Sequence, residues 1–279
     1  MSRIELAGAN VAITGGARGI GLATAKAFAE QGANVWIGDV DGELAAEVAA
    51  GLGGRGFTLD VRSKPSYAAF LQQVDGPLDV LVNNAGIMPL GRFLDEDDAV
   101  TEAILDINTL GMIWGMKLAL RAMVERGRGH VVNVASYMGK VPLAGAATYA
   151  ASKHAVVGLS EAVRDELRGT GVTVTAVLPS AVRTELVAGV QTGGILPTVD
   201  PEDIADGIVR SCSHRRAIVA VPGWMRVYEP VVALLPDTVV GAVRGRLARE
   251  RTIEHLDHAA RSSYTARVDA LASSATSVR

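Results

Sequence analysis

The first ~220 residues alternate short, β-branched apolar runs with longer amphipathic stretches, and this rhythm restricts the fold more than any other feature. Most short runs are apolar at successive positions, so both faces of each predicted strand must be buried. Strands of this kind form parallel sheets covered by helices on both sides. The predicted strands are Asn10–Thr14, Asn34–Asp39, Gly56–Leu59, Val80–Asn83, His130–Ala135, Val172–Leu178 and Ala217–Val221.

The stretches between these runs predict helices, and no linker rich in Pro, Gly or Ser divides the chain. Gly32 and Gly171 are placed to end two helices, because glycine readily adopts the left-handed conformation at a helix C-terminus. The predicted fold class is therefore α/β, with a doubly wound, seven-stranded parallel sheet flanked by helices on both faces. The predicted helices are Ile20–Gln31, Asp41–Gly51, Lys64–Val74, Asp97–Arg126, Ala150–Gly169 and Pro201–Ser211.

Composition excludes several classes of protein. The 279 residues are 49% hydrophobic and 20% charged, which suits a packed core and not a disordered chain. The formal net charge of -3 provides no overall attraction to nucleic acid or anionic membrane. A single cysteine, Cys212, rules out an internal disulfide and a cysteine-built zinc site, and we expect no metal. Met1–Gly8 lacks a leader pattern and no uninterrupted apolar run reaches about 18 residues, so we expect a soluble, cytoplasmic protein.

Residues 1–222 are predicted to form the α/β unit, with 223–279 as an extension of the same domain that is helical and partly disordered. Within this extension, 224–251 joins an apolar segment to four arginines. It is either a surface helix pair with arginine stems on apolar neighbours, or a patch that contacts membrane lipid or a partner subunit. The glycine-containing stretch Thr184–Val199 predicts a mobile loop or a short helical pair.

The segment Val11–Gly21 reads VAITGGARGIG, a strand that passes through a glycine-rich turn into a helix. Gly15 permits a tight turn, and Gly19 and Gly21 allow a ligand close to the start of the helix. The free N–H groups and the dipole at that helix end favour a pyrophosphate. Three glycines alone can be an ordinary turn, but the strand–turn–helix context predicts a dinucleotide site.

Asp39 ends the second predicted strand, 18 residues after Gly21. A carboxylate at this position can accept hydrogen bonds from both adenosine ribose hydroxyls and would repel a 2′-phosphate. Asp41 adds to that repulsion. Arg18 acts in the opposite direction if it pairs with such a phosphate, or it is a solvated charge beside the pyrophosphate. We expect the acidic strand end to prevail, with NAD as cofactor and NADP less favoured.

Tyr149 and Lys153 are four residues apart in YAASK, so a helix places them on one face, one turn apart. Tyrosine has an ordinary pKa of about 10 and is a poor base at neutral pH. A neighbouring ammonium stabilises the phenolate and lowers that pKa, and an oxidised nicotinamide adds further positive field. A Tyr and a Lys at this spacing are common by chance, and the alternative interpretation of the pair is a simple surface contact.

Taken together, the motifs resemble those of the short-chain dehydrogenase/reductase family, over about Leu6 to Pro222. The sequences that carry the resemblance are TGGARGIG at Thr14–Gly21, Asp60 in LDV, NNAG at Asn83–Gly86, Asn108 in NTLG, Ser136 in NVAS and the YAASK pair. Ser136 precedes Tyr149 by 13 residues, the interval typical of the family. The resemblance implies a Rossmann fold and an oxidoreductase that transfers hydride between a nicotinamide and a carbon bearing a hydroxyl or carbonyl, without a metal.

The resemblance also implies the roles of individual residues. Tyr149 exchanges a proton with the substrate oxygen, Ser136 hydrogen-bonds that oxygen, and Lys153 holds the nicotinamide ribose. Asn108 anchors a water that links Lys153 to solvent, although an asparagine here can also serve a helix kink and Ser136 can be a helix cap. The implied cofactor contacts are Gly15, Arg18, Gly19, Ile20, Gly21, Asp39, Asp60, Val61, Asn83, Ala85, Gly86, Pro179, Val182 and Thr184, with Tyr149 and Lys153.

One position departs from the family pattern. Where the family usually has Pro-Gly, this chain has Pro179 followed by Ser180, which is strained if the backbone requires a positive φ. Val182 and Thr184 keep their places, so the departure concerns the nicotinamide-side loop and not the class of cofactor.

Apolar residues flank the catalytic motifs, and they predict a secondary alcohol or ketone on a lipophilic molecule as the substrate. The alternatives are an NADPH-dependent carbonyl reductase and a cofactor-binding scaffold without enzymatic activity. The resemblance implies a homo-oligomer, a dimer or tetramer, assembled through the Asp97–Arg126 and Ala150–Gly169 helices. The flanking residues are Met88, Leu90, Tyr137, Met138, Val141 and Leu143, with Leu186–Leu196 as a mostly uncharged cover.

Overall fold

The computed structural model describes residues 3–190, 197–227 and 256–275. At its centre is a seven-stranded sheet in the order β3-β2-β1-β4-β5-β6-β9, with every pair of neighbours parallel. The predicted fold class is confirmed, and the predicted strands differ from the observed ones only at their ends. The strands are β1 (Asn10–Thr14), β2 (Asn34–Asp39), β3 (Arg55–Thr58), β4 (Leu78–Asn83), β5 (Gly129–Val134), β6 (Val172–Pro179) and β9 (Ile218–Val221).

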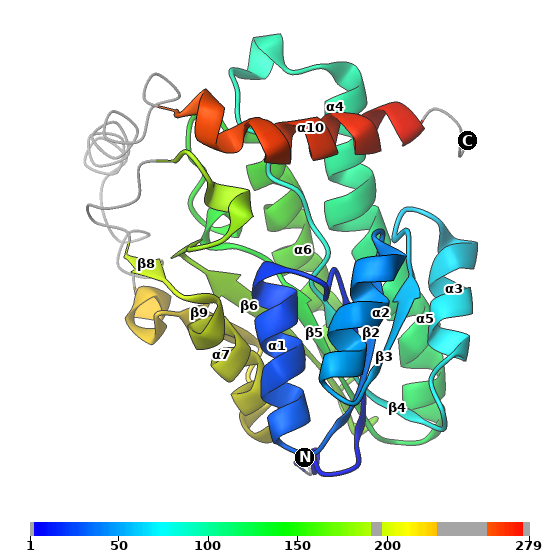
Figure 1. Ribbon diagram of the computed structural model, residues 1–279. Helices are drawn as coiled ribbons and strands as arrows, with labels where there is room; N and C mark the ends of the chain where they lie inside the picture. The colour runs from blue at the N-terminus through cyan, green and yellow to red at the C-terminus, as the bar shows by residue number, and fades with distance from the viewer. Residues whose placement is uncertain (1–2, 191–196, 228–255, 276–279) are drawn as a thin grey trace.

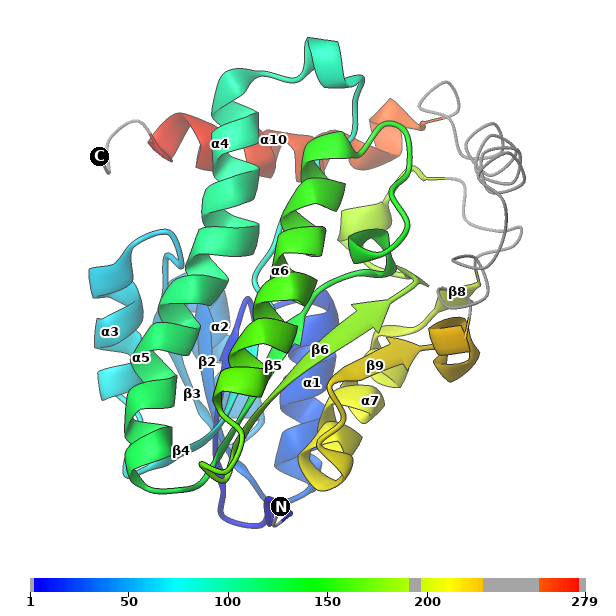
Figure 2. The same cartoon turned by 180° about the vertical axis from the view of Figure 1, so that it is seen from behind.

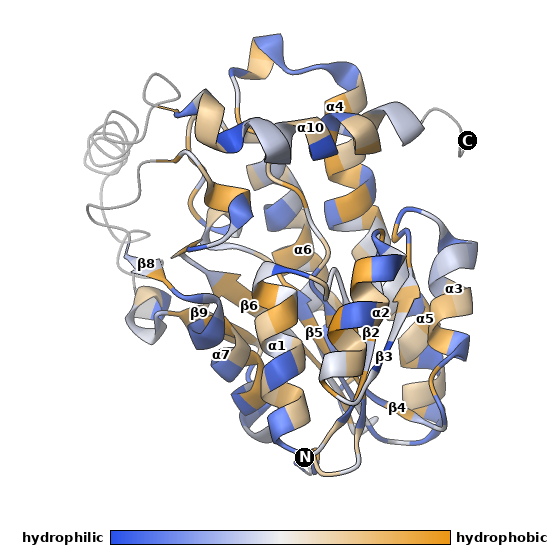
Figure 3. Ribbon diagram, viewed as in Figure 1, coloured by the Kyte–Doolittle hydropathy of each residue, from blue (hydrophilic) through white to orange (hydrophobic). Residues whose placement is uncertain are grey.

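Helices cover the sheet in two layers, one of α1, α2 and α7 and the other of α3, α5 and α6 (Figures 1 and 2). Apolar and polar residues alternate along these helices, which is the pattern of helices with one face on a core (Figure 3). The helices are α1 (Gly19–Glu30), α2 (Gly42–Gly51), α3 (Lys64–Gln72), α4 (Asp98–Leu105), α5 (Gly111–Glu125), α6 (Ala147–Glu166), α7 (Pro201–His214) and α10 (His258–Ala275).

Each layer encloses its own hydrophobic core. On one side Phe28 of α1 and Ile204 of α7 pack, fully buried, against apolar strand residues such as Val11. On the other side Tyr67 of α3 and Met123 of α5 do the same. Burying a large apolar side chain stabilises the fold by roughly 1.5–3 kcal/mol. The strands are therefore held between two apolar layers, as their continuous apolar runs predict.

The chain reverses its direction of winding between β1 and β4, which lie side by side in the sheet. In open parallel sheets the crevice at the carboxyl ends of the strands beside such a switch point is the usual place for a ligand. The turn after β1 and the loop after β4 both emerge there. The fold thus brings the glycine-rich turn beside the NNAG segment.

Residues 98–125 form one continuous helix, in which a π-helical turn at Asp106–Leu110 separates α4 from α5. This helix is long and apolar enough to cross a membrane by length and composition, with a mean hydropathy of 1.3 over its most apolar window. Half of that window is buried inside the structure, because α5 packs on β4 and β5. It serves here as a core helix.

The two segments outside the strand–helix rhythm differ partly from expectation. After β6, β7 (Ala181–Val182) pairs in parallel with β8 (Thr198–Val199), a contact the sequence did not suggest, and a short 3-10 helix covers Glu185–Val187. In the C-terminal extension, 258–275 form α10, which confirms the helical part of the prediction for this segment. The basic patch predicted within 224–251 lies almost entirely outside the described residues.

Candidate active site

The turn after β1 is packed so tightly that two of its positions accept only glycine. Gly15 has φ +62°, and a Cβ there would lie 2.8 Å from the Cα of Ala85. A Cβ on Gly21 would lie 2.1 Å from the carbonyl oxygen of Gly15. The hydroxyl of Thr14 accepts hydrogen bonds from the backbone N–H groups of Asn84 and Ala85, at 3.0 and 3.1 Å. The turn and the NNAG segment therefore hold each other in place through close packing and hydrogen bonds.

Helix α1 begins directly after this turn, and no side chain caps its N-terminus. Its N-cap residue, Arg18, makes no capping hydrogen bond, and its first turn contains no acidic residue. By contrast, α2, α3 and α4 are capped by the side chains of Asp41, Ser63 and Asp97. The N–H groups at the start of α1 therefore remain available to an anion, which the helix dipole also favours.

At the end of β2, Asp39 is 9% exposed, and its carboxylate faces the turn. It accepts hydrogen bonds from the backbone N–H groups of Ala17 at 3.1 Å and Asp41 at 3.2 Å. Arg18 donates to the carboxylate of Asp41 at 2.8 Å, and this bond lowers the pKa of Asp41. The arginine beside the turn is thus already paired with a carboxylate.

Beyond β3, Asp60 forms an ion pair that the sequence did not suggest. Arg62 donates to both carboxylate oxygens of Asp60, at 2.7 to 3.1 Å. Another nitrogen of Arg62 donates to the carbonyl of Leu271 in α10, at 2.7 Å. Asp60, one of the cofactor contacts that the resemblance implies, is therefore linked through Arg62 to the C-terminal helix.

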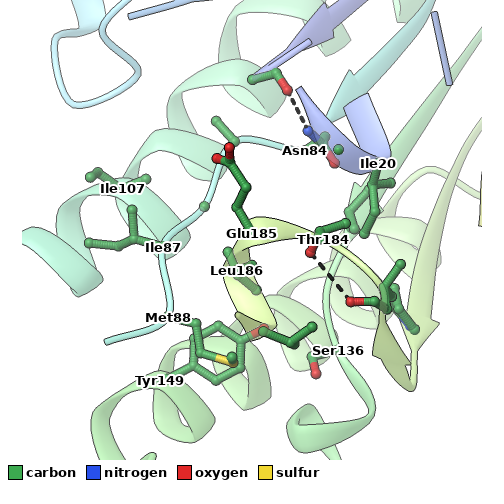
Figure 4. A pocket seen from close by; sticks show the side chains of 18 of the residues that line it. Ile20, Asn84, Ile87, Met88, Ile107, Ser136, Tyr149, Thr184, Glu185 and Leu186 are labelled. Atoms are coloured by element: carbon green, nitrogen blue, oxygen red, sulfur yellow. Dashed lines mark hydrogen bonds between the residues drawn. The ribbon is translucent and has the colours of Figure 1, made fainter. Parts of the chain in front are cut away.

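The predicted catalytic side chains converge where β5 ends and α6 begins. Tyr149 is the third residue of α6 and Lys153 follows one turn later, with 5% and 3% of their surfaces exposed. The ammonium of Lys153 donates to the carbonyl of Val134 at 3.0 Å and lies 5.7 Å from the centre of the Tyr149 ring. Ser136, two residues after β5, lines the same cavity as Tyr149 and accepts a hydrogen bond from the N–H of Met138 at 3.1 Å. Figure 4 shows Ser136 and Met88 near the Tyr149 ring.

Burial has the largest effect on the pKa values of this pair. It raises the pKa of Tyr149 above its ordinary value, although the Ser136 hydroxyl opposes the rise. Burial also lowers the pKa of Lys153 to about 8. The net shift of the Tyr149 pKa is therefore upward, opposite in direction to the lowering that a neighbouring ammonium favours. When no further positive charge is present, desolvation of the phenol raises its pKa by more than the neighbouring ammonium lowers it.

Asn108 is fully buried in the π-helical turn and does not line the cavity. Its amide accepts from the N–H of Ile87 at 2.8 Å and donates to the carbonyl of Ile87 at 2.9 Å. It also donates to the hydroxyl of Ser152 at 3.1 Å. The side chain thus fixes the loop after β4 against α6, one residue from Lys153, and both the kink and the positioning roles fit its geometry.

A cavity of about 980 Å³ extends over the carboxyl ends of the strands from Asp39 to Tyr149. Two expected cofactor contacts do not line it. Gly21 packs against the turn itself, and the amide of Asn83 bonds instead to Tyr67 and Asn133 within the core. The expected residues that do line it are Gly15, Arg18, Gly19, Ile20, Asp39, Asp60, Val61, Ala85, Gly86, Ser136, Tyr149, Lys153, Pro179, Val182 and Thr184.

The departure at Ser180 causes no strain. Among the described residues, Arg215 is the only non-glycine with a positive φ, so Ser180 does not need the conformation that glycine would supply. Its N–H donates to the carbonyl of Val221 at 3.0 Å and its hydroxyl to the carbonyl of Pro197 at 2.8 Å. The serine therefore ties the loop after β6 to its surroundings.

Several lining residues were missed at the level of sequence. Asn84 lies within the NNAG motif, so the motif could have predicted it as a lining residue. Arg62 follows Asp60 but belongs to no motif. Tyr264, Arg267 and Leu271 reach the cavity from α10, for which no family motif was present. Among the described residues, no group of three His, Cys, Asp or Glu side chains is placed to hold a metal ion.

Comparison with known proteins identifies the family. Residues 9–193 match the family model described as short chain dehydrogenase. The chain belongs to the short-chain dehydrogenase/reductase family. The members of this family are oxidoreductases that act on CH–OH groups with a nicotinamide cofactor, and the cavity fits such a dinucleotide. An uncapped helix end, an acidic strand end and a buried lysine lie along the cavity, a set of groups that suits a pyrophosphate and two riboses.

The chain is similar to several curated members of the family. It is 36% identical over 243 residues to the probable oxidoreductase EphD of Mycobacterium tuberculosis, covering 84% of this chain and 39% of that protein. The chain therefore spans about two fifths of the length of this relative. It is 42% identical over 192 residues to the monensin polyketide synthase putative ketoacyl reductase of Streptomyces virginiae, covering 65% and 73%.

Solved structures of the family share the fold. An oxidoreductase from Burkholderia phymatum in complex with NAD superposes with a TM-score of 0.74 at 23% identity, covering 81% of this chain and 93% of that one. A single-residue variant of the actinorhodin polyketide ketoreductase with NADPH gives a TM-score of 0.72 at 31% identity, covering 77% and 96%. The same fold therefore accommodates both nicotinamide cofactors.

Proposed function

We propose that this protein is an NAD-dependent oxidoreductase that interconverts a secondary alcohol and a ketone on a lipophilic substrate, with Tyr149 as acid and base. The observation that carries the proposal is one continuous cavity, with the carboxylate of Asp39 at one end and Tyr149 among apolar side chains at the other. The nicotinamide, when bound, supplies or accepts the hydride.

The protein's own residues then handle the proton and the substrate oxygen. The phenol of Tyr149 donates its proton to that oxygen in ketone reduction and takes it back in alcohol oxidation. Ser136, which lines the same cavity as Tyr149, stabilises the negative charge that develops on the oxygen. Lys153 provides positive charge beside the phenolate, and Asn108 keeps the neighbouring loop in register.

The charges around the adenosine end favour NAD over NADP. A 2′-phosphate would have to approach the buried carboxylate of Asp39, and two like charges in a poorly solvated site repel strongly. Arg18, the residue able to neutralise such a phosphate, is engaged by Asp41. An NADPH-dependent carbonyl reductase remains the competing function, since a related ketoreductase structure contains NADPH.

The substrate end of the cavity is apolar. All six residues expected to form its wall line it, and Leu186 and Val187 pack there beside Tyr149. Arg183 also lines the cavity but forms an ion pair with Asp200, at 2.5 Å. A small, charged hydroxy acid would lose its hydration at this end without gaining a partner there. A hydrophobic alcohol or ketone buries its apolar surface instead.

A substrate panel tests this proposal. The purified protein is mixed with NAD or NADP and with secondary alcohols of increasing apolar bulk, alongside small hydroxy acids, and reduced cofactor is followed by its absorbance. We expect turnover with NAD that rises with apolar bulk. Turnover confined to hydroxy acids would overturn the substrate class, and a clear preference for NADP would favour the carbonyl reductase.

Two further proposals concern the whole protein. We propose a homo-oligomer, a dimer or tetramer, that assembles through the outer sides of α4–α5 and α6. Leu105 and Val124 support this, being 43% and 37% exposed on the long helix although they are apolar. The cytoplasmic location stays a prediction from the sequence.

A further inference from the structure

Helix α10 crosses the structure at the carboxyl ends of the sheet strands (Figure 1). One of its faces is buried, through Arg261, Tyr264, Val268 and Ala272, which are spaced three or four residues apart. Three neighbouring α10 residues line the cavity: Tyr264, Arg267 and Leu271. The helix is therefore part of the wall of the site and not a surface appendage.

The buried face of α10 contains a charged residue, Arg261, that is only 3% exposed. Its guanidinium donates to the main-chain carbonyls of Leu186 at 2.9 Å and Ala188 at 3.1 Å, and to the carbonyl of Met88. It also lies 4.6 Å from the centre of the Tyr264 ring. Burying a cation is costly unless its donors are satisfied, so these three carbonyls hold the side chain in place.

The three carbonyls belong to two separate loops. Met88 follows β4, whereas Leu186 and Ala188 belong to the segment after β6. The peptide groups of Met88 are held on both sides, because its N–H donates to the hydroxyl of Tyr264 at 2.7 Å while its carbonyl accepts from Arg261. A single side chain from α10 thus joins the two loops.

Those loops provide the apolar wall beside Tyr149. The side chains of Met88 and Leu186 pack in one cluster with the Tyr149 ring (Figure 4). The spacing between the loops sets the width available to a substrate at this end. Arg261 does not itself line the cavity, so it acts through the two loops and through Tyr264, whose ring it covers.

We propose that Arg261 is a positioning residue, which fixes the segment 186–188 against Met88 and thereby sets the size of substrate that the apolar end accepts. This inference rests on the proposed function for its substrate readout, but the position of the loops can be measured without any substrate. Lysine can replace only part of the contact, because one ammonium lacks the planar fork that reaches several carbonyls at once.

The test compares Arg261→Met and Arg261→Lys with the wild type. The matched control is Arg168→Met, which removes an arginine that is largely exposed and pairs with Asp165 outside the site. Hydrogen–deuterium exchange of peptides covering 184–190 and 86–90 is measured on the ligand-free proteins. We expect at least about tenfold faster exchange of both peptides in Arg261→Met, an intermediate effect in Arg261→Lys and none in the control, since tenfold reflects the loss of about 1.4 kcal/mol.

Kinetics supply the second readout. With the best alcohol of the panel, we expect KM to rise about tenfold in Arg261→Met, corresponding to about 1.4 kcal/mol, while kcat and the Kd for NAD stay within about threefold. Arg261→Lys should recover part of the loss. Unchanged exchange of 184–190 in a folded Arg261→Met or Arg261→Lys would overturn the inference, whether or not any alcohol is oxidised. A protein that oxidises no alcohol but shows the exchange effect contradicts the proposed function alone.

Discussion

The ammonium of Lys153 lies 5.7 Å from the centre of the Tyr149 ring, yet its hydrogen bond goes to the main-chain carbonyl of Val134. The lysine is thus held beside the phenol by the end of β5 and not by the phenol itself. Its charge reaches the Tyr149 oxygen through space, and both side chains are largely buried. The two residues therefore form a functional pair whose effect depends on what else occupies the cavity.

Replacing Tyr149 by phenylalanine removes the proton donor and preserves the ring that packs with Met88. We expect kcat to fall at least about a thousandfold, since general acid–base catalysis contributes about 10²–10⁴. The Kd for NAD should change by less than about threefold, because Asp39 and the α1 N-terminus are untouched. Steady-state kinetics and fluorescence titration measure the two. A phenylalanine variant that keeps wild-type turnover would refute the role of the tyrosine.

Lys153 should also make stability depend on pH. Its pKa is about 8 in the folded protein and 10.5 when unfolded, so the unfolded chain binds more protons between these values. The free energy of unfolding should therefore rise with pH across this window, by about 3 kcal/mol relative to Lys153→Met. Urea unfolding of both proteins at several pH values measures the difference. Parallel curves for the two proteins would show that Lys153 is not desolvated.

Much of the fold was predictable because its signals are local. Continuous apolar runs indicate strands buried on both faces, and the seven that were predicted form the seven-stranded sheet. The need for glycine at position 21 follows from a backbone contact within the turn, and the positive φ of Gly15 is likewise a local property of the turn. The catalytic set was found from joint motifs, since Tyr149 and Lys153 share a helix face whatever surrounds them.

What could not be predicted depends on contacts between distant parts of the chain. Arg261 is 173 residues from Met88, and its partners are main-chain carbonyls that have no sequence signature. Asn83 stands in a cofactor motif, but its side chain turns into the core because Tyr67 and Asn133 supply partners there. The helical spacing of Tyr264 and Val268 was a usable signal for α10 that alanine and serine on the other positions obscured.

His130 should make the protein sensitive to acid. It is fully buried in β5, where its ring nitrogens bond to the hydroxyls of Thr173 at 2.8 Å and Ser211 at 3.0 Å. Burial lowers its pKa from 6.5 to about 3. Between these values His130 is therefore protonated in the unfolded chain and neutral in the folded protein. Stability should fall as pH drops through this window, with a slope approaching about 1.4 kcal/mol per pH unit.

The test for His130 is its replacement by glutamine, an amide that does not titrate. We expect a lower free energy of unfolding than wild type at neutral pH, because the two hydroxyls lose well-placed partners. As the pH falls below 6.5, the gap between the variant and the wild type should narrow. Chemical denaturation at a series of pH values supplies the curves. A constant gap over this range would mean that His130 is protonated in the folded protein.

Under the proposed function, cofactor choice should depend on Asp39, whose buried carboxylate ends β2 and faces the glycine-rich turn. In Asp39→Ala we expect the Kd for NAD to rise about tenfold or more, because hydrogen bonds to a charged group contribute about 1.5–3 kcal/mol. The Kd for NADP should fall in the same variant, since the repulsion is removed while Arg18 remains nearby.

Glu43→Ala, which removes an exposed carboxylate from the first turn of α2, is the matched control and should bind both cofactors as the wild type does. Titration of the three proteins with each cofactor gives the ratio of the two constants. A wild type that binds NADP more tightly than NAD, or a ratio unchanged in Asp39→Ala, would show that the strand end does not select the cofactor.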